Sequence, residues 1–252
     1  MTKSIYHMTS GEVAAALAGN QTVVVPFGSV EQHGPHLPCG TDTIAAKLVA
    51  EEVAARLDAV VVPFGPYGVT PIHAGHPGTV SLRRTTFESL LGDICDEMVA
   101  MGATRFVFVN WHEGNIASMD AVATELQARH KGVYIAVAHA CYTAQRVYAA
   151  EGGELTHGGG IETLAVIAHD PSLAAVEAAG EATRSEHAAA MDEMRRDREV
   201  HGYITDVTEI DDDGWYGNPR WATAEAAVGF AGRMADEIVP AVERIFALRG
   251  GG

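Results

Sequence analysis

Four short apolar runs, separated by segments with helical periodicity, constrain the fold of this chain more than any other feature. The runs are residues 22–26 (TVVVP), 59–63 (AVVVP), 105–109 (RFVFV) and 133–138 (VYIAVA). The segments expected to be helical are residues 43–57, 85–101, 116–129, 162–168, 182–199 and 222–247. Apolar runs that alternate with helices are typical of a parallel sheet covered on both faces. We therefore predict an α/β fold with a mostly parallel sheet and helices on both faces, formed by one domain over residues 1–252.

The composition excludes several classes of function. The chain has 252 residues and a formal net charge of −16. An acidic surface repels phosphate backbones and anionic lipid, so we expect neither a nucleic-acid partner nor a membrane surface. The first 20 residues lack the continuous apolar core of a signal peptide, and no run is long enough to span a bilayer. Three widely spaced cysteines, Cys39, Cys95 and Cys141, are typical of a reducing compartment, and we expect the protein to be cytoplasmic.

Residues 28–42 (GSVEQHGPHLPCGTD) concentrate polar side chains directly after the first predicted strand. Glu31 and His33 are two positions apart, so both side chains point the same way if the segment is extended. Asp42 follows a loop that contains Pro35 and Pro38, and it is also a possible N-cap of the next helix. A carboxylate has two oxygens and can bridge two cations about 3.5–4 Å apart. This stretch therefore predicts a metal site.

The next strand ends carry further histidines and acids. The third predicted strand is followed by residues 110–115 (NWHEGN), which include His112, and residues 67–82 contain His73 and His76. Residues 156–163 (THGGGIET) add His157 and Glu162 as a fourth candidate. Ligands of open α/β sheets bind beyond the carboxyl ends of the strands. Mixed nitrogen and oxygen ligands suit Zn, Mn, Fe or Co, and the lack of a thiolate cluster argues against a structural zinc site.

Some of these features have simpler explanations. Isolated histidines such as His130, His169 and His201 are usually surface or core residues, and Cys39 is more simply a small filler than a nucleophile. The glycines at 158–160 lack the lysine and hydroxyl of a phosphate loop, and they predict close backbone approach instead. Four aromatic side chains are either core residues or walls of a substrate pocket. One lies at the third strand end and three lie in or near the polar segment 202–220: Trp111, Trp215, Tyr216 and Trp221.

Four stretches, in order along the chain, resemble the motifs of the creatininase (creatinine amidohydrolase) family. They are VPFGSVEQHGPHLPCGTD, VNWHEGN, HGGGIET and GWYGNPRWATAE, and they extend from about residue 25 to residue 225. The resemblance implies a creatininase-like α/β fold, two divalent metal ions per chain, hydrolysis of a C–N amide bond and a homohexamer. It also implies that Glu31, His33, Asp42 and His112 are metal ligands, with Asp42 as the bridge.

The same resemblance makes Glu162 the fifth ligand and His157 a proton donor or acceptor that faces the substrate. The chain departs from creatininase itself, which has a glutamate ligand where this sequence has Gly114, while Glu113 lies one position earlier. Glu113 is therefore a second candidate catalytic residue, and whether Glu113 or Glu162 completes the metal site stays open. Trp111 replaces the usual glycine before His112. We therefore expect a member of the family other than creatininase proper.

These observations predict a metal-dependent amidohydrolase that cleaves a small cyclic or linear amide, of the lactam or formamide class, with a metal-bridging hydroxide. Zinc or manganese is the expected metal, and iron is possible. The predicted substrate pocket contains His73, His76, Trp111, Trp215 and Tyr216. The alternatives are a hydrolase that acts on a sugar-like or cyclitol-like ring, a mononuclear non-haem iron oxygenase with a two-histidine, one-carboxylate triad, and a metal-binding protein without catalysis.

Overall fold

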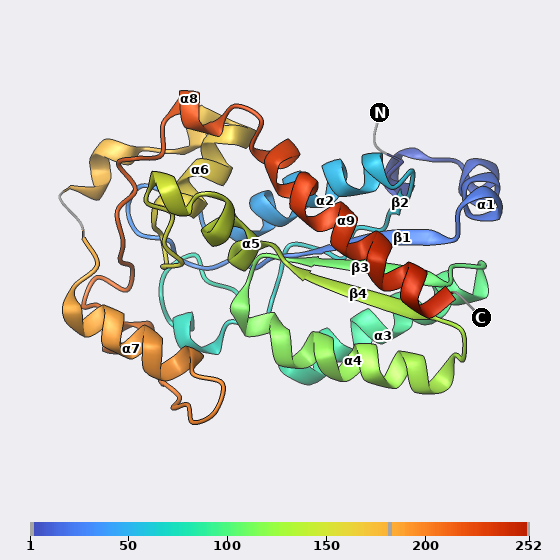
Figure 1. Ribbon diagram of the computed structural model, residues 1–252. Helices are drawn as coiled ribbons and strands as arrows, with labels where there is room; N and C mark the ends of the chain where they lie inside the picture. The colour runs from blue at the N-terminus through green and yellow to red at the C-terminus, as the bar shows by residue number, and fades with distance from the viewer. Residues whose placement is uncertain (1–2, 181–182, 251–252) are drawn as a thin grey trace.

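The computed structural model describes residues 3–180 and 183–250, and it contains a four-stranded parallel sheet between two layers of helices (Figure 1). The strands are β1 (Thr22–Phe27), β2 (Val60–Val61), β3 (Arg105–Asn110) and β4 (Tyr134–His139). Their order is β2-β1-β3-β4, and each pairing is parallel, with Val24 opposite Val107 and Val107 opposite Ala136. This confirms the predicted α/β fold. Residues 1, 2, 181, 182, 251 and 252 of the predicted domain lie outside the described ranges.

Helices cover both faces of the sheet. Figure 1 shows α2 (Thr41–Arg56) and α9 (Phe230–Gly250) on one face, and α3 (Arg84–Ala100) and α4 (Ile116–Arg129) on the other. The remaining helices are α1 (Ser10–Gly19), α5 (Ala140–Val147), α6 (Gly160–His169), α7 (Glu186–Arg196) and α8 (Ala224–Ala227). Short 3₁₀ helices occur at Ile5–His7, Pro71–His73, Glu113–Asn115, Ala149–Glu151, Pro171–Leu173, Val176–Ala179 and Val207–Glu209.

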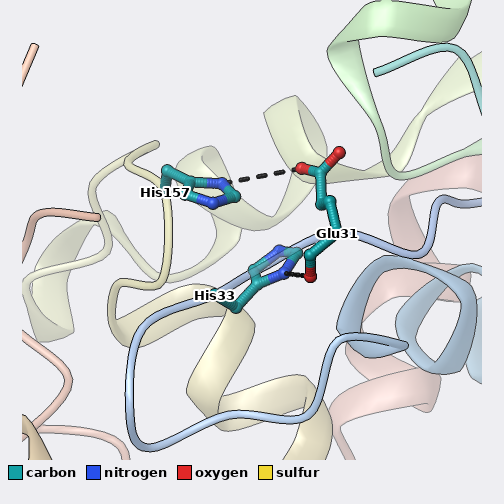
Figure 2. A group of neighbouring side chains, drawn as sticks. All are labelled: Glu31, His33 and His157. Atoms are coloured by element: carbon teal, nitrogen blue, oxygen red, sulfur yellow. Dashed lines mark hydrogen bonds and ion pairs between the residues drawn. The ribbon is translucent and has the colours of Figure 1, made fainter. Parts of the chain in front are cut away.

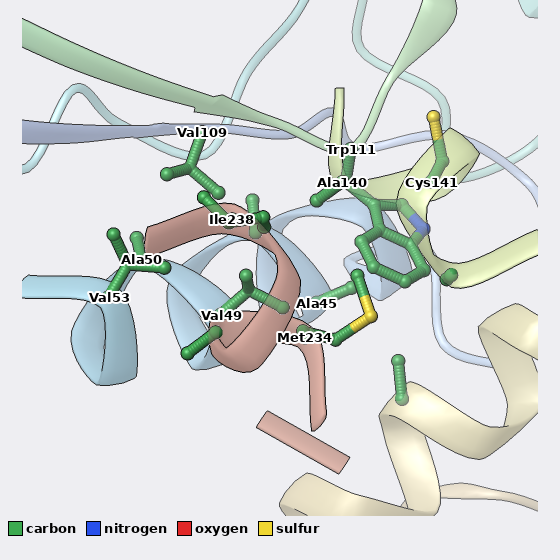
Figure 3. Packing of buried hydrophobic residues seen from close by; sticks show 14 of the residues in the cluster. Ala45, Val49, Ala50, Val53, Val109, Trp111, Ala140, Cys141, Met234 and Ile238 are labelled. Carbon is green, nitrogen blue, oxygen red and sulfur yellow. The ribbon is translucent and has the colours of Figure 1, made fainter. Parts of the chain in front are cut away.

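Alternate strand residues supply two separate hydrophobic cores. Val24, Val107 and Val109 pack with α2 and α9, while Phe106 and Phe108 pack with α3 and α4. Figure 3 shows the first of these cores, where side chains of α2 and α9 meet beneath Val109. Because both faces of the sheet are buried, the strands are apolar at nearly every position rather than at every second one.

A proline inside the central strand β1 is tolerated because of its register. Val62 N–H donates to the carbonyl of Val24, so Val24 faces β2, and Pro26, two residues on, faces the same side. Strand β2 pairs with β1 only at Val23 and Val24, so no ladder hydrogen bond is required from Pro26. The predicted second strand, residues 59–63, is correspondingly shortened to two residues.

Several predicted element boundaries were wrong. The sequence analysis missed α1, although Thr9 and Glu12 form a reciprocal capping box at its start, and it missed α5. The helix predicted over residues 222–247 is divided into α8 and α9, because Gly229 between them has φ of +72°. Helix α7 begins at Glu186, and residue 182 of its predicted range lies outside the described residues. Asp42 is not an N-cap, since α2 begins at Thr41 and Asp42 lies in its first turn.

The carboxyl ends of the strands define where the polar segments meet. In Figure 1 the strands run toward α5, α6 and α7, and the loops that follow β1, β2 and β3 converge there. Within the part of the chain that the structure describes, no helix combines the length and apolar character needed to cross a membrane.

Candidate metal centre

Five of the side chains predicted as metal ligands come together at the carboxyl edge of the sheet. Glu31 and His33 lie in the loop after β1, Asp42 in the first turn of α2, His112 directly beyond β3, and Glu162 in the first turn of α6. Each is at most 8% exposed. With His157 they form three groups of potential ligands: Glu31, Asp42 and His112; His33, Asp42 and Glu162; and Glu31, His33 and His157. The first two groups share Asp42.

The shared residue, Asp42, offers a different oxygen to each group. Its Oδ2 lies 3.0 Å from Nδ1 of His112, and its Oδ1 lies 3.3 Å from Nε2 of His33. Glu31 completes the first group, with Oε1 3.4 Å from His112 Nδ1, and Glu162 completes the second, with Oε2 3.8 Å from His33 Nε2. This is the arrangement that a bridging carboxylate between two cations requires.

The donor atoms fit divalent cations. Nδ1 of His33 donates to the carbonyl of Glu31 at 3.0 Å, and Nε2 of His112 donates to the carbonyl of Val69 at 3.0 Å. Metal-ligating histidines ordinarily donate their other N–H in this way, which directs the free lone pair toward the metal. Nε2 of His33 and Oε2 of Glu31 are buried without a hydrogen bond to the described residues. Buried polar atoms of this kind need a partner, and a cation would supply one.

The electrostatics of the cluster also favour positive charge. Burial lowers the pKa of His33, but the charges of Asp42 and Glu162 outweigh it and raise that pKa to about 10. Burial likewise opposes the charged form of His112, yet Glu31 and Asp42 raise its pKa to about 9. Burial raises the pKa of Glu162 to about 8 against the attraction of His33. Three buried carboxylates thus attract either protons or cations.

His157, which forms the third group with Glu31 and His33, is a neutral imidazole. Its Nε2–H donates to the carbonyl of Gln32 at 2.6 Å, which leaves Nδ1 facing Glu31 Oε1 at 3.7 Å. Figure 2 shows the ring of His157 next to Glu31 and His33, and its centroid lies 4.4 Å from that of His33. Burial and the nearby rings of His33 and His73 keep the pKa of His157 well below its usual range. At neutral pH Nδ1 therefore keeps its lone pair, and a proton that it accepts is readily released.

One cavity of about 670 Å³ opens onto the cluster. Of the predicted pocket residues, His73, Trp111 and Tyr216 line it. His76 and Trp215 are not among its lining residues: His76 faces Asp206 at 3.4 Å, and Trp215 packs on His36 with ring centroids 4.6 Å apart. A larger hollow of about 1130 Å³ lies between α1 and β2, and none of the metal-ligand groups found in the described residues is on its wall.

Glu113 lines the same cavity but has other partners. Arg196 donates to both of its oxygens, at 2.9 and 2.8 Å, and Tyr142 O–H donates at 2.7 Å. Burial raises the pKa of Glu113, but Arg196 outweighs this and lowers it to about 2. The position that follows cannot hold a side chain in this conformation, because a Cβ on Gly114 would lie 2.1 Å from the carbonyl oxygen of Val69. In this geometry Glu162, and not Glu113, joins the ligand groups.

The sequence analysis did not identify three residues that orient the site. Ser29 Oγ donates to Asp42 Oδ2 at 2.7 Å, and the backbone N–H of Gly158 donates to Glu162 Oε2 at 2.6 Å. Gln32 accepts from the Gly34 N–H at 3.0 Å and donates to the Gly214 carbonyl, which ties the first loop to the late one. Ser29 and Gln32 lie within the polar stretch 28–42. Their closeness to Glu31 and Asp42 along the sequence was the one pattern that could have identified them.

Comparisons with known proteins agree with this geometry. The family model described as "Creatininase: Creatinine amidohydrolase" matches residues 6–242. A mycofactocin precursor peptide peptidase of Mycobacterium tuberculosis (strain CDC 1551 / Oshkosh) is 30% identical over 249 residues, which is 93% of this chain and 91% of that protein. The peptidase of the same name from Mycolicibacterium smegmatis (strain ATCC 700084 / mc(2)155) is 42% identical over 111 residues, 42% of this chain and 44% of that protein. The chain thus matches less than half the length of this second relative.

A solved structure titled "Creatininase Mn" has the same fold. It superposes with a TM-score of 0.78 at 23% identity, covering 97% of this chain and 99% of that chain. The family match covers nearly the whole chain and includes the segments that carry every predicted ligand. The resemblance drawn from the sequence motifs is therefore confirmed, and this chain belongs to the creatininase family of metal-dependent amidohydrolases.

Proposed function

We propose that the protein is an amide hydrolase in which Glu31, His33, Asp42, His112 and Glu162 hold two divalent cations, with zinc or manganese as the suited metals and iron as a further possibility. The observation that carries this proposal is the position of Asp42, whose two oxygens face two separate groups of ligands. A site for one cation would need only one of these groups.

When bound, the two cations would activate a water molecule as a nucleophile and polarise the carbonyl of the scissile amide. The residues of the chain do the rest. Glu31, Asp42 and Glu162 balance the charge of the cations, and Ser29 fixes one oxygen of Asp42. His157 holds its Nε2 proton on the Gln32 carbonyl, and its Nδ1 accepts a proton and passes it to the departing nitrogen.

The cavity supports a small amide as substrate, either a lactam or a formamide. Its volume of about 670 Å³ is in the usual range for sites that bind small molecules. Trp111 and Tyr216, which are 2% and 1% exposed, are among the residues that line it. His73 lies 3.6 Å from Glu31 Oε1 on the same wall.

A peptide is the second candidate substrate, because the relative that matches 93% of this chain is named a precursor peptide peptidase. Both substrates contain an amide carbonyl, so the same ligands and the same proton transfer by His157 serve either reaction. The exposed side of the cavity, where Tyr203 is 87% exposed, leaves space for a longer chain to extend outward.

The first test is the metal content per chain, measured by mass spectrometry on protein purified without added metal or affinity nickel. We expect close to two divalent ions per chain. The protein would then be assayed against creatinine, other lactams, formamides and short peptides, before and after chelation and with Mn or Zn added back. Hydrolysis that is lost with chelation and restored by metal supports the proposal.

Two outcomes would count against it. No bound metal, with no uptake on titration, would exclude the metal mechanism. One iron per chain, together with oxygen consumption, would favour the mononuclear oxygenase.

The cytoplasmic location and the homohexamer stay predictions.

A further inference from the structure

A network of partly buried charges lies next to the candidate metal centre and takes no part in the ligand groups. At its centre is Asp192 on α7, which is 1% exposed and lies within 3.2 Å of donor atoms on Arg184, Arg195, Arg196 and Tyr216. A carboxylate with this many donors is fully compensated, although it lies out of contact with water.

Arg196 connects this network to the strand end that carries His112. Its Nε and Nη2 donate to the two oxygens of Glu113, and its Nη1 lies 3.1 Å from Asp192 Oδ2. The two N–H groups on Glu113 form a bidentate pair, which fixes direction as well as distance. Because Glu113 follows His112 directly, this pair holds the backbone next to one candidate ligand.

The same guanidinium also holds the segment that carries His157. Nη1 of Arg196 donates to the carbonyl of Leu155 at 3.0 Å, two residues before His157. Tyr216 provides a second connection between α7 and this segment. Its O–H donates to Asp192 at 2.7 Å, and its N–H donates to the carbonyl of His157 at 2.8 Å. Three segments far apart in the sequence, at residues 112–113, 155–157 and 216, therefore meet through α7.

We propose that Arg196 and Asp192 are positioning residues that set the separation between His112 and His157. Glu113 belongs to the same network as the acceptor that connects Arg196 to His112, rather than as a metal ligand or an acid–base group. This inference rests on the proposed function insofar as His157 transfers a proton near the cations. Displacements on the order of 1 Å can cost about a hundredfold in rate, so a loosened network should lower kcat.

The test compares Arg196→Lys and Asp192→Asn with Arg129→Lys, the matched control. Arg129 also donates to both oxygens of an aspartate, Asp96, at 3.1 and 3.0 Å, but this pair is exposed and joins the ends of α3 and α4. We expect both network variants to keep the wild-type metal content and a similar KM, while kcat falls about a hundredfold. Arg129→Lys should keep all three values. Tyr142→Phe, which removes one hydrogen bond to Glu113, is a milder variant in case the others fail to fold.

Two readouts do not require a known substrate. Cobalt replaces the native metal as a probe, and we expect its visible absorption bands to shift in the network variants but not in Arg129→Lys. Hydrogen exchange followed by mass spectrometry should show faster exchange in residues 112–116 and 153–160 of the network variants, with or without metal.

The outcomes separate the two proposals. Absence of cobalt uptake in the wild-type protein would exclude the metal centre, while faster exchange in both segments would still support the positioning role. Faster exchange confined to α7, with cobalt spectra and kcat unchanged, would show that the network merely stabilises α7 and would overturn the inference.

Discussion

The two oxygens of Asp42 have different neighbours, and the proposal of two cations depends on this single side chain. Oδ1 faces His33 and Oδ2 faces His112, while Ser29 donates to Oδ2. Every other candidate ligand belongs to only one of the two groups formed around Asp42. Substitutions at the residue scale should therefore have unequal effects on metal content.

Asp42→Asn should remove both cations. An amide has one oxygen and no charge, so it cannot bridge two cations or balance their charge. We expect close to zero metal ions per chain and loss of measurable hydrolysis, whereas His112→Gln should retain one ion. Metal analysis of both purified variants checks this, and two ions bound to Asp42→Asn would contradict a bridging role.

Ser29→Ala tests the hydrogen bond that orients Asp42. Residues that orient metal ligands typically contribute about 10- to 100-fold in metal affinity or activity, and we expect a loss in that range. Thr124→Ala is the control, because its hydroxyl donates to a backbone carbonyl on the exposed side of α4. Titration with a chelator measures the metal affinity of each variant. Equal affinities in Ser29→Ala and Thr124→Ala would show that Ser29 has no role in the site.

At the scale of elements, the two layers of helices have different relations to the site. Helix α6 carries Glu162 in its first turn and packs in the core that α2 and α9 share. Helix α4 begins next to His112, but its buried residues belong to the opposite core, beneath the other face of the sheet. Equal losses of core packing in these two helices should therefore affect the site differently.

Leu164→Ala on α6 and Leu126→Ala on α4 form a matched pair. Both leucines are 0% exposed, and each truncation should lower the free energy of unfolding by about 2–5 kcal/mol. Only Leu164→Ala should also weaken metal binding, because it lies two residues from Glu162. Denaturant unfolding and metal titration together measure this, and an equal loss of affinity in both variants would argue against local control by α6.

At the scale of the whole molecule, the cations should stabilise the fold. The ligands come from segments after β1 and β3 and from the starts of α2 and α6, so a bound cation connects parts of the chain that are far apart. A ligand that binds only the folded state at 100 times its Kd contributes about 2.7 kcal/mol.

Chelation should consequently lower Tm, and added Mn or Zn should restore it. Removing the cations also leaves three buried carboxylates, Glu31, Asp42 and Glu162, with only His33, His112 and bound protons to balance their charge. Thermal unfolding with and without chelator measures the change, and Asp42→Asn should show none. A wild-type Tm that does not respond to chelator would contradict metal binding to the folded protein.

The sequence by itself determined the sheet, the family and the stretches that carry the candidate ligands, because these depend on local patterns. Fully apolar runs mark strands buried on both faces, and the stretch 28–42 carries three of the five candidate ligands within fifteen positions. The sequence did not predict the boundaries of β2 or the break between α8 and α9. The first depends on a neighbouring strand, and the second depends on the backbone conformation at Gly229.

Only the tertiary structure decided which side chains meet across long separations. Glu113 and Arg196 are 83 positions apart, and the sequence contains no pattern that pairs them. The same holds for the choice of Glu162 over Glu113 beside His33, and for the contact that turns Trp215 toward His36 and away from the cavity. Such contacts follow from how the helices pack at the carboxyl edge of the sheet, where distance along the chain no longer predicts distance in space.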